Sequence, residues 1–170
     1  MLFRCEEMKG DLFANKQQCD VLVHACSCTG SWGAGIAKEF EKRFPRAKAG
    51  HDKFLQKCRM MRMESLGKSY LSPLESDKKD WKVHTVGCLF TSRGHGKAKD
   101  EPGVILDATM YAIEDLLRDI EASVPGDQPI SIASPCINAG LFGVPWHLTR
   151  EIILRALWEH PRIYWQIWRL

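Results

Sequence analysis

The sequence lacks the features that mark membrane-spanning and nucleic-acid-binding chains. No stretch approaches the roughly 18 apolar residues needed to cross a bilayer, and acidic residues stand near the N-terminus where a signal peptide has an apolar core. An excess of one charge is also missing, because 24 Lys and Arg oppose 21 Asp and Glu without any long block of like charge. We therefore expect an intracellular protein, cytoplasmic or nuclear, that binds neither membrane nor nucleic acid.

The chain has no internal repeat, no low-complexity tract and no loop long enough to link two domains. Its 170 residues, 45% of them hydrophobic, are enough to bury one sizeable core. We expect a single domain over residues 1–170, and nothing in the composition requires more than a monomer.

Cysteine pairs at metal-binding spacing are missing too. The chain has seven cysteines, an odd number, and several lie within apolar segments. Cys26 and Cys28 stand one residue apart, but no second pair of Cys or His follows at the spacing of a zinc finger. We expect free, buried thiols and no bound metal.

What the chain does have is an alternation of apolar strand-like and amphipathic helix-like segments. The expected strands are short apolar runs bounded by Gly, Pro or polar residues, at 2–8, 21–25, 83–90, 130–133 and 163–168. The expected helices carry apolar stripes at helical spacing: Ile36, Phe40 and Phe44; Leu106, Met110, Ile113, Leu117 and Ile120; and Leu148, Ile152 and Ala156 within 148–159. Polar segments at 75–82, 92–103 and 122–129 are expected to be surface loops.

Alternating strands and helices predict an α/β sandwich with a mostly parallel or mixed sheet, because each crossover helix covers a sheet face. Ligands of such folds bind at the carboxyl ends of the strands.

A glycine-containing loop at 26–35 joins the second expected strand to the helix that starts near Ile36. Such a loop exposes backbone N–H groups beside a helix N-terminus, which suits a phosphate, but it also suits a tight turn. No Gly-Lys-Ser/Thr ends the loop, and Lys38 stands where a dinucleotide-binding loop has glycine. The pattern therefore disfavours a nucleoside-triphosphatase or a nicotinamide enzyme.

A second loop of this kind, at 134–146, follows the expected strand at 130–133. Two loops that each lead from a strand into a helix are able to hold the two phosphates of one extended ligand. This recurrence favours an anion-binding site over a pair of simple turns.

Three strings of residues stand in the order in which macrodomains carry them: Lys9-Gly10-Asp11-Leu12; His24-Ala25-Cys26-Ser27 with Gly33-Ala34-Gly35-Ile36-Ala37; and Ile137-Asn138-Ala139-Gly140-Leu141-Phe142-Gly143-Val144-Pro145-Trp146. The chain resembles a macrodomain over nearly its whole length. Its Gly30-Ser31-Trp32-Gly33, Cys88-Leu89-Phe90-Thr91-Ser92 and Phe142–Trp146 strings are most similar to the fungal ADP-ribose 1''-phosphate phosphatases.

The resemblance implies a three-layer α/β/α domain with a mixed central sheet that binds ADP-ribose or ADP-ribose 1''-phosphate. It implies substrate contacts at Gly10, Asp11, Leu12, Ala25, Cys26, Ser27, Trp32, Gly33, Ala34, Gly35, Ile36, Ala37, Ile137, Asn138, Ala139, Gly140, Leu141, Phe142 and Gly143. Asp11 matches the aspartate that accepts from the adenine amino group, although a Gly-Asp pair also caps turns. Phe142 matches a position over the ribose or phosphate, but it also suits packing.

The common phosphatase motifs are absent. No cysteine has an arginine six positions later, no Asp-x-Asp pair occurs, and no clustered carboxylates indicate two metals. The remaining mechanism is attack by water without a metal or cofactor, assisted by a side chain that transfers a proton.

The resemblance points to His24 as that side chain, because the phosphatase branch carries histidine where many macrodomains have asparagine. A structural histidine is the alternative. Asn138 is the second predicted catalytic residue, with its amide near the terminal phosphate or the water. His95, in a polar segment, is expected to be a solvated loop residue, and a position over the cleft is the alternative. The tryptophans near the C-terminus are expected to pack.

The implied function is hydrolysis of ADP-ribose 1''-phosphate, a by-product of tRNA splicing, to ADP-ribose and phosphate. Removal of ADP-ribose from modified proteins and non-catalytic ADP-ribose reading are the alternatives, with ADP-ribosylated proteins as partners. One branch of macrodomain hydrolases uses a lysine and an aspartate where this chain has Ser92 and Phe142, which disfavours that route.

Overall fold

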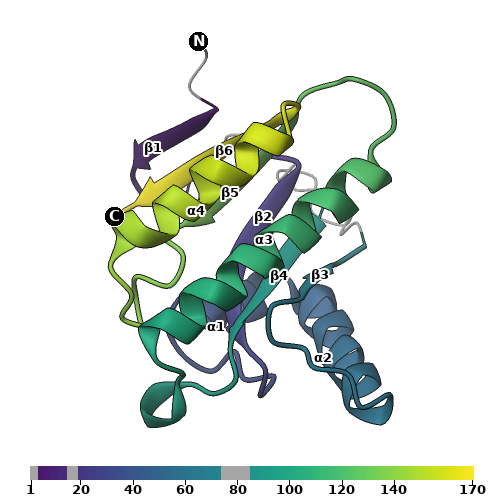
Figure 1. Ribbon diagram of the computed structural model, residues 1–170, viewed down its shortest axis with the longest axis vertical. Coiled ribbons are helices and arrows are strands. Elements are labelled where there is room, and N and C mark those ends of the chain that lie inside the picture. Colours follow the sequence, from purple (N-terminus) through teal and green to yellow (C-terminus); the bar gives the residue numbers. More distant parts are fainter. Residues whose placement is uncertain (1–3, 15–18, 74–84) are drawn as a thin grey trace.

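The strands found in the structure extend the predicted apolar runs. The computed structural model describes residues 4–14, 19–73 and 85–170. Its strands are β1 (Cys5–Lys9), β2 (Val21–Ser27), β3 (Ser69–Leu71), β4 (Thr85–Ser92), β5 (Ile130–Pro135) and β6 (Ile163–Arg169). They form one sheet in the order β1-β6-β5-β2-β4-β3 (Figure 1). Every pair is parallel except β3 with β4, so the predicted mixed sheet is confirmed.

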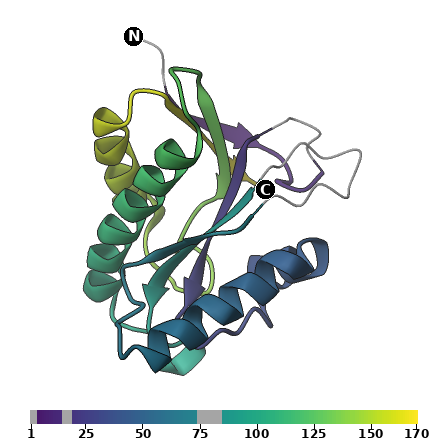
Figure 2. The ribbon, with the colours of Figure 1, turned by 90° about the vertical axis from the view of Figure 1, so that its right-hand side faces the viewer.

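Helices cover both faces of this sheet, as the prediction of three layers requires. They are α1 (Gly35–Arg43), α2 (Pro45–Met60), α3 (Pro102–Ser123) and α4 (Trp146–Glu159), with a short 3-10 turn η1 (Gly96–Ala98) before α3. Helices α3 and α4 lie on one face, and α1 and α2 lie on the other (Figure 2). Within the described ranges, no helix combines the length and apolar character that a membrane crossing needs.

Side chains alternate between the two faces along β2, which divides the core into two layers. Val21 and Val23 pack with the α3 and α4 side chains, whereas Leu22 and Cys26 pack with those of α1 and α2. This alternation places every second residue of the strand beneath one pair of helices.

Two predicted stripes match the buried faces of their helices only in part. Met110 is 45% exposed, and the buried face of α3 runs instead through Ile105, Ala108, Thr109, Ala112, Ile113, Leu116, Leu117 and Ile120. On α4, Leu148 and Ile152 are half-buried at the edge of a face centred on Thr149 and Ile153. The later residues of both predicted stripes, Ile113, Leu117 and Ile120 on α3 and Ala156 on α4, are buried as predicted. Each contact face is wider than one row of side chains, so the first residues of each stripe lie at its edge.

Some boundaries also differ from the predictions. The helix predicted from Ile36, Phe40 and Phe44 ends at Arg43, and Phe44 precedes Pro45 at the start of α2. The predicted loop at 92–103 holds η1 and the start of α3, and α3 continues to Ser123. The predicted loop at 75–82 and the first residues of the strands predicted at 2–8 and 83–90 lie outside the described residues.

Helix α2 and strand β3 were not predicted. The buried residues of α2 are Ala47, His51, Leu55 and Cys58, a helical spacing that small and polar residues conceal. Pro45 at the first turn is a helix-start signal, since proline is favoured there. Strand β3 has only 3 residues, too few for an alternating pattern to stand out.

Candidate functional site

The carboxyl ends of three neighbouring parallel strands meet at one edge of the sheet. The loops that leave β2, β4 and β5 lead into α1, α3 and α4. They enclose a cavity of about 650 Å³, lined by Ala25, Cys26, Ser27, Ser31, Gly33, Ala34, Gly35, Ile36, Ala37, His95, Gly96, Pro135, Cys136, Ile137, Asn138, Gly140, Leu141 and Phe142. The cavity therefore lies where the strand order predicts a ligand site.

Most of the predicted contact residues line this cavity, and a defined group of them does not. The residues that stand away from its wall are Gly10, Asp11, Leu12, Trp32, Ala139 and Gly143. The wall also contains residues that were not predicted to bind: Ser31, His95, Gly96, Pro135 and Cys136. The two predicted glycine-containing loops thus face one space, and the β4–α3 loop closes its third side.

The first loop brings the amino end of α1 to the cavity wall. Gly35 opens the helix with a φ of 60°, and the preceding Ala34 offers no side-chain cap. The first N–H groups of a helix have no partner within it, and the helix dipole makes this end positive. Because Gly35, Ile36 and Ala37 all line the cavity, this end of α1 can bind an anion.

The second loop is fixed by the side chain of Asn138, which is buried and has a φ of 65°. The Thr109 hydroxyl donates its proton to the Ile105 carbonyl at 2.6 Å. The Thr109 oxygen is therefore the acceptor for Asn138 Nδ2, which lies 2.8 Å away. The Thr91 hydroxyl then donates to Asn138 Oδ1 at 2.9 Å. The amide therefore ties the loop to β4 and α3.

The tips of the two loops meet across the cavity. Leu141 is exposed, and its Cδ1 atom lies 3.0 Å from the position that a Cβ atom on Gly35 would occupy. The exposed Leu141 side chain can move aside by a few tenths of an ångström, so it is the φ of 60° that favours glycine at position 35.

Trp32 anchors the first loop from inside the protein. Its indole Nε1 donates to His51 Nε2 at 3.3 Å, and both side chains are buried. His51 therefore carries its proton on Nδ1, which lies 3.1 Å from Asp52 Oδ1. Burial lowers the pKa of His51 although Asp52 opposes the shift, so the imidazole stays neutral and keeps its acceptor.

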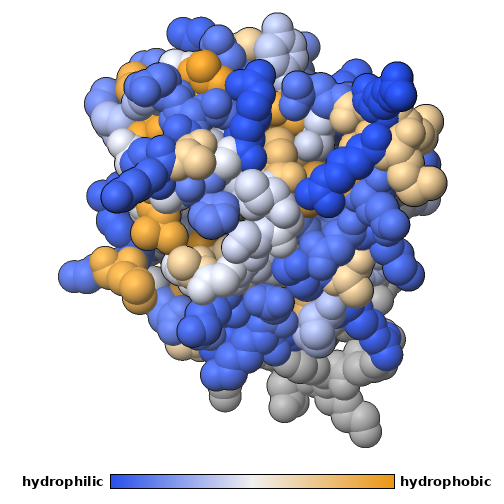
Figure 3. Space-filling model, turned by 90° about the horizontal axis from the view of Figure 1, so that it is seen from below, coloured by the Kyte–Doolittle hydropathy of each residue, from blue (hydrophilic) through white to orange (hydrophobic). Residues whose placement is uncertain are grey.

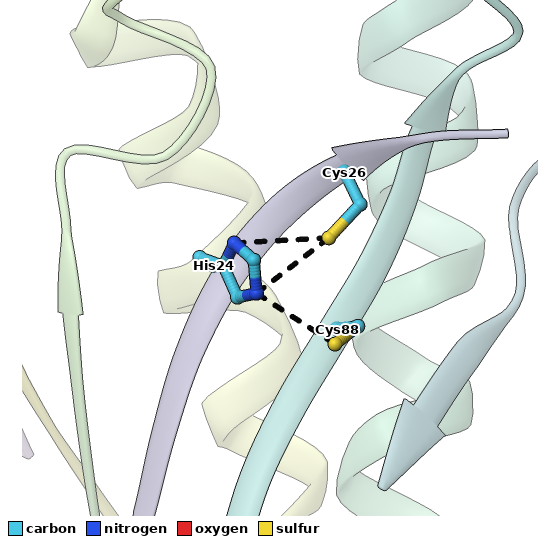
Figure 4. A group of neighbouring side chains, drawn as sticks. All are labelled: His24, Cys26 and Cys88. Atoms are coloured by element: carbon cyan, nitrogen blue, oxygen red, sulfur yellow. Dashed lines mark hydrogen bonds between the residues drawn. The ribbon is translucent and has the colours of Figure 1, made fainter. Parts of the chain in front are cut away.

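His24 lies beneath this loop and does not line the cavity. Its imidazole stacks on Phe40 with ring centroids 4.0 Å apart and meets the edge of Trp32 at 4.5 Å. Its ring nitrogens lie 3.7 Å from the sulfurs of Cys26 and Cys88 (Figure 4). Burial, with a smaller contribution from nearby His51, lowers the pKa of His24 to about 3. A direct catalytic role requires an imidazole that reaches the cavity, which this conformation does not provide.

Asp11 has the turn-capping contact that was the alternative to adenine binding. Its Oδ1 accepts the N–H of Phe13 at 2.9 Å, and the N–H of Gly10 donates to the Arg169 carbonyl at 2.7 Å. Leu12 is buried in the core layer under α1 and α2. The adenine contact remains a prediction.

His95 is an exposed loop residue, as predicted, and it also lines the cavity, as the alternative had it. It precedes η1 in the loop between β4 and α3, and the same loop carries Lys99. Lys99 Nζ lies 3.3 Å from the position of a Cβ atom on Gly143, so a positive charge stands beside the second loop. At this end of the molecule, apolar side chains lie in patches among hydrophilic ones (Figure 3).

The chain matches the family model described as Macro domain over residues 23–153. It is 33% identical over 174 residues to a protein of Debaryomyces hansenii named ADP-ribose 1''-phosphate phosphatase, covering 92% of this chain and 96% of that one. A Candida albicans protein of the same name is 34% identical, with 95% and 96% covered.

Solved structures show the same fold. The macrodomain of Mycobacterium tuberculosis DarG superposes with a TM-score of 0.69 at 22% identity, covering 98% of this chain and 97% of that one. Thermosipho africanus DarTG in complex with ADP-ribose gives a TM-score of 0.64 at 21% identity, covering 96% of this chain and 41% of that one.

Proposed function

The chain belongs to the macrodomain family, and on that premise we propose that it is a phosphatase that hydrolyses ADP-ribose 1''-phosphate to ADP-ribose and phosphate. Several fungal relatives that carry this name match most of the chain at about one third identity. The observation that carries the proposal is the cavity itself, where the uncapped amino end of α1 and the second loop face one space.

The two loops would hold the substrate's phosphates through backbone donors. The first N–H groups of α1 suit the pyrophosphate, because they combine free donors with a positive helix end. Lys99 lies beside Gly143 and adds positive potential near the second loop, although neither residue lines the cavity. A volume of about 650 Å³ falls within the usual range for small-molecule sites.

We assign proton transfer to His95. Among the residues that the structure describes, no carboxylate lines the cavity, and only His95 brings an imidazole to its wall. In the reaction, a water oxygen bonds to phosphorus while the bond between phosphorus and the ribose 1''-oxygen breaks. The departing oxygen takes a proton that His95 supplies, and the attacking water loses a proton that returns to His95, so the products are ADP-ribose and inorganic phosphate.

We assign positioning roles to His24 and Asn138, the two residues that were predicted to be catalytic. His24 acts through Trp32, whose neighbours Ser31 and Gly33 line the cavity. Asn138 holds the second loop through Thr91 and Thr109. Loss of either side chain should weaken substrate binding before it affects the chemical step.

The proposal is tested by incubating the purified protein with ADP-ribose 1''-phosphate and measuring phosphate and ADP-ribose together. We expect equal amounts of both products, with or without EDTA, because no metal takes part in the hydrolysis. Binding of ADP-ribose without phosphate release would identify a reader instead. Release of ADP-ribose from a modified protein, without phosphatase activity, would identify a protein hydrolase.

A further inference from the structure

Three metal-ligating side chains converge on the face of the sheet covered by α1 and α2 (Figure 4). His24 and Cys26 point the same way from β2, and Cys88 on β4 stands opposite His24 in the strand register. One ligand atom from each residue lies within 4.8 Å of the other two, and all three residues are buried. Among the residues that the structure describes, they form the only such group of three.

We propose that His24, Cys26 and Cys88 form a binding site for a thiophilic divalent cation, represented by zinc. Zinc binds sulfur at about 2.3 Å and imidazole nitrogen at about 2.0 Å, which places the two atoms about 3.5 Å apart at a tetrahedral angle. The sulfur–nitrogen distances here are 3.7 Å. Because Cys26 Sγ lies 3.7 Å from both ring nitrogens, it stands off the lone-pair axis of each, and the imidazole and the Cys26 side chain must rotate to reach a common ion.

The ligand types decide which cation fits. Two thiols and an imidazole suit zinc and its soft analogues, whereas magnesium and calcium prefer oxygen ligands. A divalent ion with two thiolates and a neutral imidazole has no net charge, which suits a site beside Phe40 and Trp32. A monovalent ion would leave one negative charge buried there.

Binding proceeds by exchange of protons for the cation. Each cysteine S–H loses its proton as a metal–sulfur bond forms, and the neutral imidazole donates a lone pair. One zinc ion therefore enters, two protons leave, and no electron is transferred.

The site lies beside the substrate cavity without being part of its proposed chemistry. Cys26 lines the cavity, so one residue of the cluster stands at the cavity wall. Three protein ligands leave one zinc coordination position for water, as in open zinc sites. No step of the proposed hydrolysis passes through the cluster, so the two proposals stand or fall separately.

Cadmium titration of the chelator-treated full chain tests the site, because thiolate-to-cadmium charge transfer absorbs in the ultraviolet. We expect one cadmium per chain and that absorption in the wild type. Cys88→Ser should lose both. Cys58→Ser is the matched control, because Cys58 is also buried but lies on α2 outside the cluster, and it should retain both.

A measurement on the wild type alone guards against misfolding of the Cys88→Ser protein. X-ray absorption of the zinc-loaded chain should show two sulfur neighbours and at least one nitrogen around the ion. A shell of nitrogen and oxygen only, binding that Cys88→Ser leaves unchanged, or no stoichiometric binding by the wild type would overturn the proposal.

Discussion

The two faces of the central sheet are built from different chemistry. The layer under α3 and α4 is mainly aliphatic, with Val23, Ile113, Leu116, Ile132, Ile153 and Ile163 among its buried members. The layer under α1 and α2 is aromatic and contains sulfur, with Trp32, Phe40, Phe90, Cys26 and Cys88. Two buried histidines, His24 and His51, stand among those aromatic rings.

The difference shows how the protein separates stability from site geometry. Aliphatic packing has no direction, so the apolar contacts of the first layer mainly stabilise the fold, and on that side the second loop is fixed by the hydrogen bonds of Asn138 to Thr91 and Thr109. The second layer has directional contacts, and these lead from His51 through Trp32 to the loop that lines the cavity. Changes to the two layers should therefore differ in what they do to the site.

The largest expected effect is loss of stability from the aliphatic layer. Leu116 is fully buried, and we expect Leu116→Ala to lower the free energy of unfolding by about 2–5 kcal/mol. Denaturant unfolding measures this, and kcat and KM of the folded fraction should stay unchanged. Phe40→Leu is the partner variant, and it should also weaken ADP-ribose binding because Phe40 stacks on His24. Equal effects of both variants on binding would remove the contrast between the layers.

The aromatic layer is tested by His51→Leu, which leaves the buried N–H of Trp32 without its acceptor. We expect a loss of about 1–3 kcal/mol in the free energy of unfolding. We also expect ADP-ribose affinity, measured by calorimetry, to fall on the order of tenfold, equivalent to about 1.4 kcal/mol. Unchanged affinity would show that Trp32 does not position the first loop.

A polar contact on the α3 and α4 side should affect stability and not the site. His160 bonds Glu121 at 2.9 Å and Glu114 at 3.1 Å. Burial lowers the pKa of His160, but the two glutamates outweigh it and raise the pKa overall. The stability that protonated His160 contributes is thus fully present below the pKa of about 6.5 that histidine has in the unfolded chain. It is lost as the pH rises through the pKa of His160 in the folded protein.

We therefore expect His160→Gln to cost about 1 kcal/mol at pH 6 and less at pH 9. Urea unfolding of both proteins at the two pH values measures the difference. A cost that grows with pH would contradict the assignment, and ADP-ribose affinity should be the same in both proteins.

The smallest expected effect comes from the outer end of the Trp32 anchor. Lys48 pairs with the half-exposed Asp52, which in turn faces His51. Exposed ion pairs contribute little, so Lys48→Met should change the free energy of unfolding by less than about 1 kcal/mol. A thermal melt checks this, and a larger loss would show that the anchor depends on its surface charge.

The sequence predicted the aliphatic layer better than the aromatic one. Apolar runs located β2, β4, β5 and β6, because each of these strands contains a short run rich in apolar residues. Helix α2 was missed because its buried stripe includes Ala47, His51 and Cys58, which do not register as a hydrophobic pattern. A search for hydrophobic spacing therefore misses α2, because this helix packs through aromatic and polar contacts.

The candidate site was also predicted only in part from the sequence. Both glycine-containing loops were predicted, because their signals are local in the sequence. The place of His95 at the cavity wall and the link from Trp32 to His51 depend on segments brought together only by the fold. The wall position of His95 and the buried position of His24 therefore required the structure.

Phosphate release from ADP-ribose 1''-phosphate by the wild type, His95→Ala and His24→Ala tests the central claim most directly, with ADP-ribose affinity measured for each. The account predicts that His95→Ala lowers kcat by about 10²–10⁴ with affinity retained, whereas His24→Ala weakens affinity with a smaller loss of kcat. A selective loss of kcat in His24→Ala, with His95→Ala fully active, would contradict it.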